Sequence, residues 1–200
     1  MKTFSCALLL GLFAIGMYHC TWTATPANSQ PTASAAAVPA ADLVKRGEYL
    51  VTIMGCNDCH SPKIMTPQGP APDPARLLSG HPADVPLAPI ADKKSVREGK
   101  WVMMHPMVTA FVGPWGTSFA ANLTPDDTGI GSWTYEQFRK ALTEGKYKGL
   151  DGGRMLLPPM PWPNMIKMSD DDMRAVFVYL KSLPPIKNAV PAPIPPTELQ

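Results

Sequence analysis

Proline is the residue type that most constrains how this chain folds. It occupies 24 of the 200 positions, whereas its usual share is about 5%. Proline fixes its own φ angle and has no backbone N–H, so helix interiors and central strands exclude it. Eight of the prolines lie between residues 61 and 92. The sequence therefore predicts long loops joined to a few short elements, and it excludes a regular helical bundle or a large sheet.

The charge content excludes two further classes of protein. Charged residues make up 17% of the chain and hydrophobic residues 45%, and the formal net charge is +2. A disordered charged tail needs the opposite balance, and a protein guided to nucleic acid by a cationic field needs a strongly basic surface. We therefore expect a globular protein that binds no nucleic acid. A chain of 200 residues has room for one domain with appendages.

The first residues are typical of an export signal. Lys2 precedes an apolar run over 7–16, which suits a signal peptide and is shorter than the roughly 20 residues of a membrane-spanning helix. We expect a signal peptide over 1–27 and a flexible spacer over 28–41. In a bacterial host the mature protein would be periplasmic or otherwise exported, either soluble or membrane-associated. Membrane association would come from an uncleaved leader or from a lipid on Cys20.

The first helix of the domain is predicted by its apolar stripe. Apolar side chains recur at helical spacing from 43 to 54, and Asp42 is the expected N-cap. Gly47 falls inside the stripe, where glycine weakens a helix. We expect it there because a second helix approaches closely, with Gly47 and Tyr49 at the crossing and with Phe177 and Tyr179 opposite them.

Capping residues predict two more helices. Thr134 and Gln137 form a capping box, and Gly145 ends a helix of about ten residues. Ser169 caps the last helix, which ends before Pro184.

The rest of the chain is predicted to be irregular. Short helical turns are expected near 76–78 and 93–99, and the strand-like runs 100–105 and 107–112 can form a small hairpin around Pro106. We expect one mostly α domain over 42–187 and a proline-rich tail over 188–200 that wraps the surface or trails free.

The motif that carries chemistry is C-x-x-C-H, formed by Cys56, Cys59 and His60 directly after the first helix. This is the attachment pattern of haem c. Two thiols one turn apart can add to the two vinyl groups of one porphyrin, and the adjacent imidazole can reach the iron. Because Cys6 lies in the leader and Cys20 in or beside it, the mature domain has one such pair and is expected to hold one covalent haem.

Two other interpretations of the cysteine pair are weaker. A structural zinc site needs four ligands, and the remaining candidates, His81 and His105, lie in a loop region without a second C-x-x-C. A thioredoxin-type redox pair is expected after a strand in an α/β pattern, whereas here an amphipathic helix precedes Cys56.

A methionine in a proline-rich loop is the candidate for the second axial position of the iron. The usual choices are methionine, histidine or an open site. Met160 stands between Pro159 and Pro161, which stiffen the backbone on both sides. Other methionines are expected to be packing residues: Met103, Met104, Met107, Met155, Met165 and Met168.

The domain resembles a class I c-type cytochrome, and more narrowly the cytochrome c subunits of bacterial membrane dehydrogenases for alcohols and sugar acids. The motifs that carry the resemblance span about residues 42–190, and they include NLTPD over 122–126, TGIG over 128–131, MPW over 160–162 and SDDDMRAVFVYL over 169–180. The resemblance implies thioethers at Cys56 and Cys59 and iron ligands at His60 and Met160. It also implies a few helices around one covalent haem.

This chain departs from the family in two ways. The family's subunits usually carry three such domains, whereas this chain has one C-x-x-C-H. The stretch 62–116 is also longer than a minimal cytochrome needs. Asn122, Trp115 and Trp133 carry N–H donors that suit haem propionates, or they serve in packing.

The expected function is single-electron transfer between a dehydrogenase-type donor and a respiratory acceptor. The expected partners are therefore redox proteins: a dehydrogenase, an oxidase or another cytochrome. No catalytic triad, phosphate loop or acid pair is present, so the chain itself is not expected to be an enzyme. The alternatives are a haem enzyme or gas sensor with an open iron, and a docking subunit of a dehydrogenase that uses 62–116 as its interface.

Overall fold

The computed structural model describes residues 39–199. The expected signal peptide, Cys20 and most of the spacer lie outside the described residues. None of the helices in the described part of the chain is long and apolar enough to cross a membrane.

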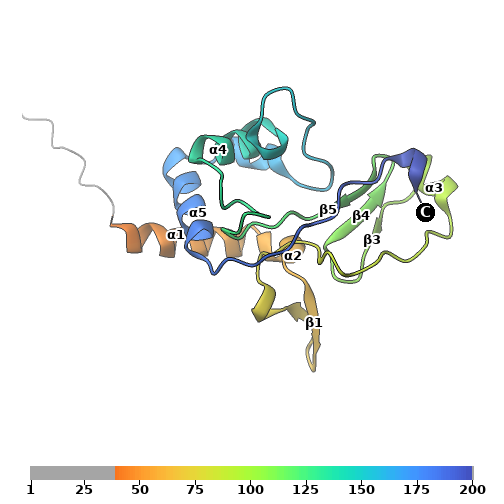
Figure 1. Cartoon of the computed structure of the whole chain (residues 1–200), viewed down its shortest axis with the longest axis horizontal. Helices are drawn as coiled ribbons and strands as arrows, with labels where there is room; N and C mark the ends of the chain where they lie inside the picture. The colour runs from red at the N-terminus through yellow and green to blue at the C-terminus, as the bar shows by residue number, and fades with distance from the viewer. Residues whose placement is uncertain (1–38, 200) are drawn as a thin grey trace, which may run out of the picture. The chain divides into compact units, whose positions relative to one another are not determined.

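Two helices that are far apart in sequence cross each other (Figure 1). These are α1, Ala40–Ile53, and α5, Asp170–Ser182. A Cβ atom on Gly47 would lie 2.1 Å from the Ala175 carbonyl oxygen and 2.6 Å from the Tyr179 Cβ. The prediction of a close approach at Gly47 is therefore confirmed, and no larger residue fits there.

The details of α1 differ from the sequence prediction in two places. The helix begins at Ala40 with Pro39 at the N-cap position, so Asp42 lies in the first turn and caps nothing. Its carboxylate there still suits the positive end of the helix. Tyr49 is 54% exposed, whereas Gly47 is buried at the crossing. An ion pair between Arg46 and Asp172, with 2.8 Å between N and O, links the two helices.

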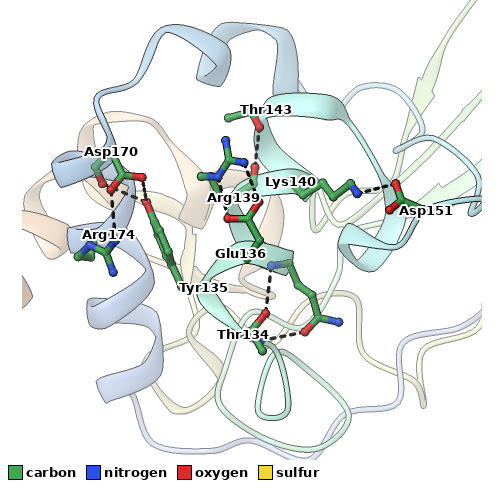
Figure 2. Close-up of polar contacts among 10 residues, drawn as sticks. Thr134, Tyr135, Glu136, Arg139, Lys140, Thr143, Asp151, Asp170 and Arg174 are labelled. Atoms are coloured by element: carbon green, nitrogen blue, oxygen red, sulfur yellow. Dashed lines mark hydrogen bonds and ion pairs between the residues drawn. The ribbon is translucent and has the colours of Figure 1, made fainter.

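Helix α4, Tyr135–Glu144, has the predicted capping box, in which Thr134 and Gln137 satisfy each other's backbone N–H groups. Gly145 ends the helix with φ 67°. Figure 2 shows that the Tyr135 hydroxyl donates to the Asp170 carboxylate at the start of α5. Burial and this hydrogen bond raise the pKa of Tyr135 to about 12. The starts of α4 and α5 are thereby joined.

The main hydrophobic core lies between these three helices and two loop residues. Its buried members are Leu50 and Val51 of α1, Phe138 of α4, Met173, Val176 and Leu180 of α5, and the loop residues Leu78 and Ile130. Ser169 caps α5 by accepting a hydrogen bond from the Asp172 N–H, as predicted.

The predicted hairpin around Pro106 is present and belongs to a larger sheet. Strands β3, Met103–Met104, β4, Ala110–Gly113, and β5, Gly116–Phe119, pair antiparallel in that order. The short helix α3, Lys93–Arg97, lies just before them in sequence, within the predicted range. The sequence did not indicate β5.

A second hairpin follows the C-x-x-C-H motif. It consists of β1, Lys63–Thr66, and β2, Gly69–Pro72, paired from Lys63↔Pro72 to Thr66↔Gly69. Two prolines are tolerated in β2 because, within this two-stranded sheet, it has only one neighbour. A 3₁₀ turn, Pro74–Arg76, comes next.

The C-terminal segment packs against the sheet (Figure 1). Ile194 forms an antiparallel bridge with Thr117 of β5. A 3₁₀ turn, Pro196–Glu198, follows, and Leu199 is buried with Val96 and Val112 in a second core cluster. Of the two alternatives for the tail, the segment up to 199 therefore wraps the domain.

Candidate functional site

The motif residues lie on a one-turn helix, α2, Cys56–His60, directly after α1. Gly55 connects the two helices with φ 69°, a left-handed conformation that glycine adopts without strain. Both cysteines are free thiols, and the side chain of Cys56 packs against the main core. The turn between α1 and α2 therefore anchors the motif to the core at its first cysteine.

The electrostatic setting of the two thiols argues against a redox-active dithiol. Burial raises the pKa of Cys56 to about 11, and burial also raises the pKa of Cys59. A reactive C-x-x-C pair has a lowered thiol pKa. These thiols are instead kept protonated at neutral pH.

His60 is oriented by a backbone carbonyl. Its Nδ1 atom lies 2.7 Å from the Ala121 oxygen. A carbonyl can only accept a hydrogen bond, so Nδ1 carries the proton, and Nε2 is the nitrogen available to a metal. Burial lowers the pKa of His60, which favours the neutral imidazole that metals bind. A ligating histidine is commonly fixed by its second nitrogen in this way.

Two loop segments hold α2 from its C-terminal side. The His60 carbonyl accepts a hydrogen bond from the Gly80 N–H at 2.7 Å, and the Ser61 hydroxyl accepts one from the Leu78 N–H at 2.8 Å. The Leu123 N–H in turn donates to the Leu78 carbonyl at 2.8 Å. Segments 78–81 and 120–123 therefore run beside each other and form the frame in which His60 is placed.

Lys63 completes the end of α2. Its ammonium donates to the backbone carbonyls of Asn57, Asp58 and Ser61. Partial burial lowers the pKa of Lys63, while the charge of Asp58 opposes that change. Lys63, Gly80 and Ala121 were not identified as site residues from the sequence. A lysine three residues after the histidine of the motif was the one available signal.

Met160 lies in the loop between α4 and α5, and several contacts fix that loop. The Leu156 N–H donates to the Gly145 carbonyl at 2.7 Å, and the Ser118 hydroxyl of β5 donates to the Pro158 carbonyl at 2.6 Å. A 3₁₀ segment, Trp162–Lys167, leads to α5. The Met160 side chain is half-buried. The loop is thus held at both ends and near Met160 itself.

The methionines that were expected to be packing residues lie in different settings. Met165 and Met168 pack against the main core, as predicted for packing residues. Met103, Met104 and Met155 are 44%, 58% and 42% exposed, and the first two lie on the sheet.

Two of the expected propionate donors are engaged within the protein. The Asn122 amide donates to Thr128 and to the Ile186 carbonyl, and its oxygen accepts two bonds from Thr124. Trp115 donates its indole N–H to the Ser118 hydroxyl at 3.2 Å. Trp133 packs against the main core. For Asn122 and Trp115 the packing alternative is therefore correct, because their N–H groups already have partners.

His81 and His105 lie together, and His105 is half-buried. His81 is fully buried, its Nδ1 lies 2.8 Å from the Thr109 hydroxyl, and its ring meets that of His105 at 5.6 Å. Within residues 39–199, no three His, Cys, Asp or Glu side chains come together as a metal cluster.

The arrangement fits haem c in its donor set. Two thiols and one imidazole lie on a single helical turn, and the imidazole has the tautomer that leaves Nε2 for iron. Cys56, Cys59 and His60 would hold the group, and bound haem would supply one-electron Fe(III)/Fe(II) chemistry.

Comparison with known proteins confirms the resemblance to dehydrogenase cytochrome subunits. The chain is 34% identical over 149 residues to the gluconate 2-dehydrogenase cytochrome c subunit of Pantoea cypripedii. It is 32% identical over 138 residues to the cytochrome c subunit of the quinone-type alcohol dehydrogenase of Gluconobacter oxydans. It is 26% identical over 176 residues to the fructose dehydrogenase cytochrome subunit of Gluconobacter japonicus. No family model matches the chain.

These matches cover most of this chain and a minority of each relative. They include 74%, 68% and 88% of this chain, but 25%, 20% and 28% of the respective relatives. All three relatives are named as cytochrome subunits of dehydrogenases. The names agree with the expectation that this chain carries electrons and is not itself an enzyme.

Proposed function

We propose that the domain has the class I cytochrome c fold, carries one covalent haem c and transfers single electrons. Cys56 and Cys59 would form the two thioethers, His60 the proximal bond to iron and Met160 the distal one. The donor would be a dehydrogenase, and the acceptor an oxidase or another cytochrome. The chain would work outside the cytoplasm as an electron-transfer subunit.

One observation carries this proposal: His60 follows both thiols on the same helical turn and donates a hydrogen bond from its Nδ1–H group to the Ala121 carbonyl. This bond fixes the plane of the ring and leaves Nε2 for a metal. Gly80 holds the backbone of the same residue through its N–H. The chain's own residues thus supply an imidazole that needs little rearrangement on binding.

In this proposal the loop around Met160 would exclude substrates from the iron. If His60 and Met160 both held the iron, no small molecule would bind there, and electron transfer would need no bond to form or break. A thioether ligand favours the reduced iron and raises the potential. The Ser118–Pro158 hydrogen bond would hold the loop so that the thioether stays in place.

The direct test is expression of the full chain together with a haem c maturation system. We expect one haem per chain that stays bound after denaturation, which protein mass and the pyridine haemochrome spectrum would both report. A chain that matures without covalent haem, while a control cytochrome c acquires it, would contradict the proposal.

Met160→Ala is expected to open the sixth position of the iron. The oxidised protein should lose its weak near-infrared Met–Fe absorption band, become high-spin and bind carbon monoxide in the reduced state. Met155→Ala and Met103→Ala serve as controls that should keep the band. If Met160→Ala keeps the band and either control loses it, the assignment of Met160 is wrong.

Ser118→Ala is expected to loosen the same loop without removing a ligand. The change removes the bond to the Pro158 carbonyl and leaves the Trp115 indole N–H without its acceptor. Because each lost hydrogen bond costs about 1 kcal/mol, the near-infrared band should disappear at a lower denaturant concentration than in the parent. Ser182→Ala is the matched control, since its hydroxyl bonds the Tyr179 carbonyl at the end of α5. If the band disappears at the same denaturant concentration in Ser118→Ala and Ser182→Ala, Ser118 does not hold the loop around Met160.

A further inference from the structure

Lys63 closes the C-terminal end of the helix that carries the motif. Its Nζ atom lies 3.1 Å from the Asn57 oxygen, 2.9 Å from the Asp58 oxygen and 2.5 Å from the Ser61 oxygen. The last carbonyls of a helix have no partner within it, and an ammonium group has three protons to donate. One side chain therefore donates to three carbonyls around Cys59 and His60, of which the Asn57 carbonyl also accepts from the Ser61 N–H.

The backbone of Lys63 is fixed by the first hairpin. Lys63 begins β1 and pairs with Pro72 of β2, and the Asp73 N–H donates to the Pro62 carbonyl at 2.8 Å. Pro62 is itself among the fully buried residues. The hairpin thus directs the lysine toward α2, and its half-buried side chain lies against the helix end.

Lys63 and Asp58 carry opposite charges near α2, and they differ in how far they are exposed to solvent. The C-terminal end of a helix is the negative end of its dipole, which a cation offsets. Asp58 is the opposite charge that acts on Lys63, but its side chain is exposed and therefore screened by solvent and salt. The half-buried ammonium is screened less, so its positive charge dominates at the end of α2.

We propose that Lys63 is a positioning residue that closes α2 and keeps a positive charge beside His60, so that the iron held there is favoured in its reduced form. The proposal rests on the proposed function. Reduction adds one electron to Fe(III) and gives Fe(II), and no proton or bond changes place. A fixed positive charge favours the state with one positive charge fewer.

The experiment is a redox titration of the haem-loaded full chain, followed by its visible spectrum. A unit charge about 10 Å away, at an effective dielectric constant of about 20, shifts such an equilibrium roughly tenfold. We expect Lys63→Met to raise the Fe(III)/Fe(II) ratio about tenfold at a fixed ambient potential, which for one electron is about 59 mV. Lys63→Arg keeps the charge and should keep most of the parent ratio.

Two further variants separate charge from hydrogen bonding and from net charge. Lys63→Gln keeps amide donors but removes the charge, so we expect the same direction of shift as in Lys63→Met. Lys93→Met removes an exposed lysine from α3 and should change the ratio little, because solvent and salt screen that site.

Three results would overturn the proposal. The first is a shift in Lys63→Met no larger than in Lys93→Met. The second is a Fe(III)/Fe(II) ratio in Lys63→Gln that equals the parent's. If Lys63→Met does not retain haem, the equivalent result is the same Fe(III)/Fe(II) ratio in Lys63→Gln and Lys63→Arg. The third is a parent chain that carries no covalent haem, which would overturn the proposed function as well. If the parent chain carries covalent haem but Lys63→Met leaves its potential unchanged, only the role of Lys63 is overturned, and the proposed function stands.

Discussion

The double variant Cys56→Ser/Cys59→Ser is expected to lose covalent haem completely. Serine hydroxyls do not add to the porphyrin vinyl groups, and these two residues are the only thiols in the described part of the chain. Haem staining after denaturing electrophoresis should fall from a strong band to none. The single variants should each keep one thioether and show a shifted pyridine haemochrome spectrum.

The control for this experiment is a variant that keeps both thiols. His60→Ala leaves Cys56 and Cys59 in place and removes the proposed proximal ligand, so any haem that attaches should have an altered visible spectrum. Staining that survives in the double serine variant would contradict attachment at these two positions. Staining lost in the double variant but kept in both single variants is the expected pattern.

The second large effect is expected at the crossing of α1 and α5. Gly47→Ala places a methyl group where only 2.1 Å separates it from the Ala175 carbonyl oxygen, so the two helix backbones must move apart. Overpacking of this kind typically costs about 1–3 kcal/mol, which exceeds the gain of about 1 kcal/mol in helix propensity. The free energy of unfolding, measured by denaturant titration of the haem-loaded protein, should fall accordingly.

Gly153→Ala is the matched control for Gly47→Ala. A Cβ atom there meets no heavy atom closer than 3.4 Å, which is an ordinary contact, so its free energy of unfolding should be unchanged or slightly higher. Gly47→Leu should lose more stability than Gly47→Ala. A Gly47→Ala variant as stable as the parent would mean that the helices do not cross at this residue.

The helical part of the fold was predictable because its signals are local. Ser169 and the Thr134–Gln137 capping box mark helix starts within four residues of sequence, and the apolar stripes need no knowledge of their partners. The hairpin β1–β2 was not predicted, because Pro70 and Pro72 argue against a strand until one knows that β2 has a single neighbour in its sheet. Strand β5 carried no alternating pattern, since its first three residues are all buried.

The site was predictable to the extent that it is contiguous in sequence. Cys56, Cys59 and His60 form one motif, and the structure places them on one turn. The group that orients His60 is a backbone carbonyl 61 residues away, and a carbonyl has no residue type that a sequence could reveal. The same holds for the bond from Ser118 to the Pro158 carbonyl. The role of Asn122 also depended on a distant partner, the Ile186 carbonyl.

The pairing of the C-terminal segment with β5 has a consequence for the order of events during biosynthesis. Chains are made N-terminus first, so the thiols of α2 appear long before Ile194 can pair with Thr117 and before Leu199 can fill the second core. Until that segment has been made, the second core cluster lacks one of its three buried members and β5 lacks its bridge to Ile194. The sheet part of the domain can therefore reach its final packing only after every residue of the main helical core has been made, because those residues all come earlier in the chain.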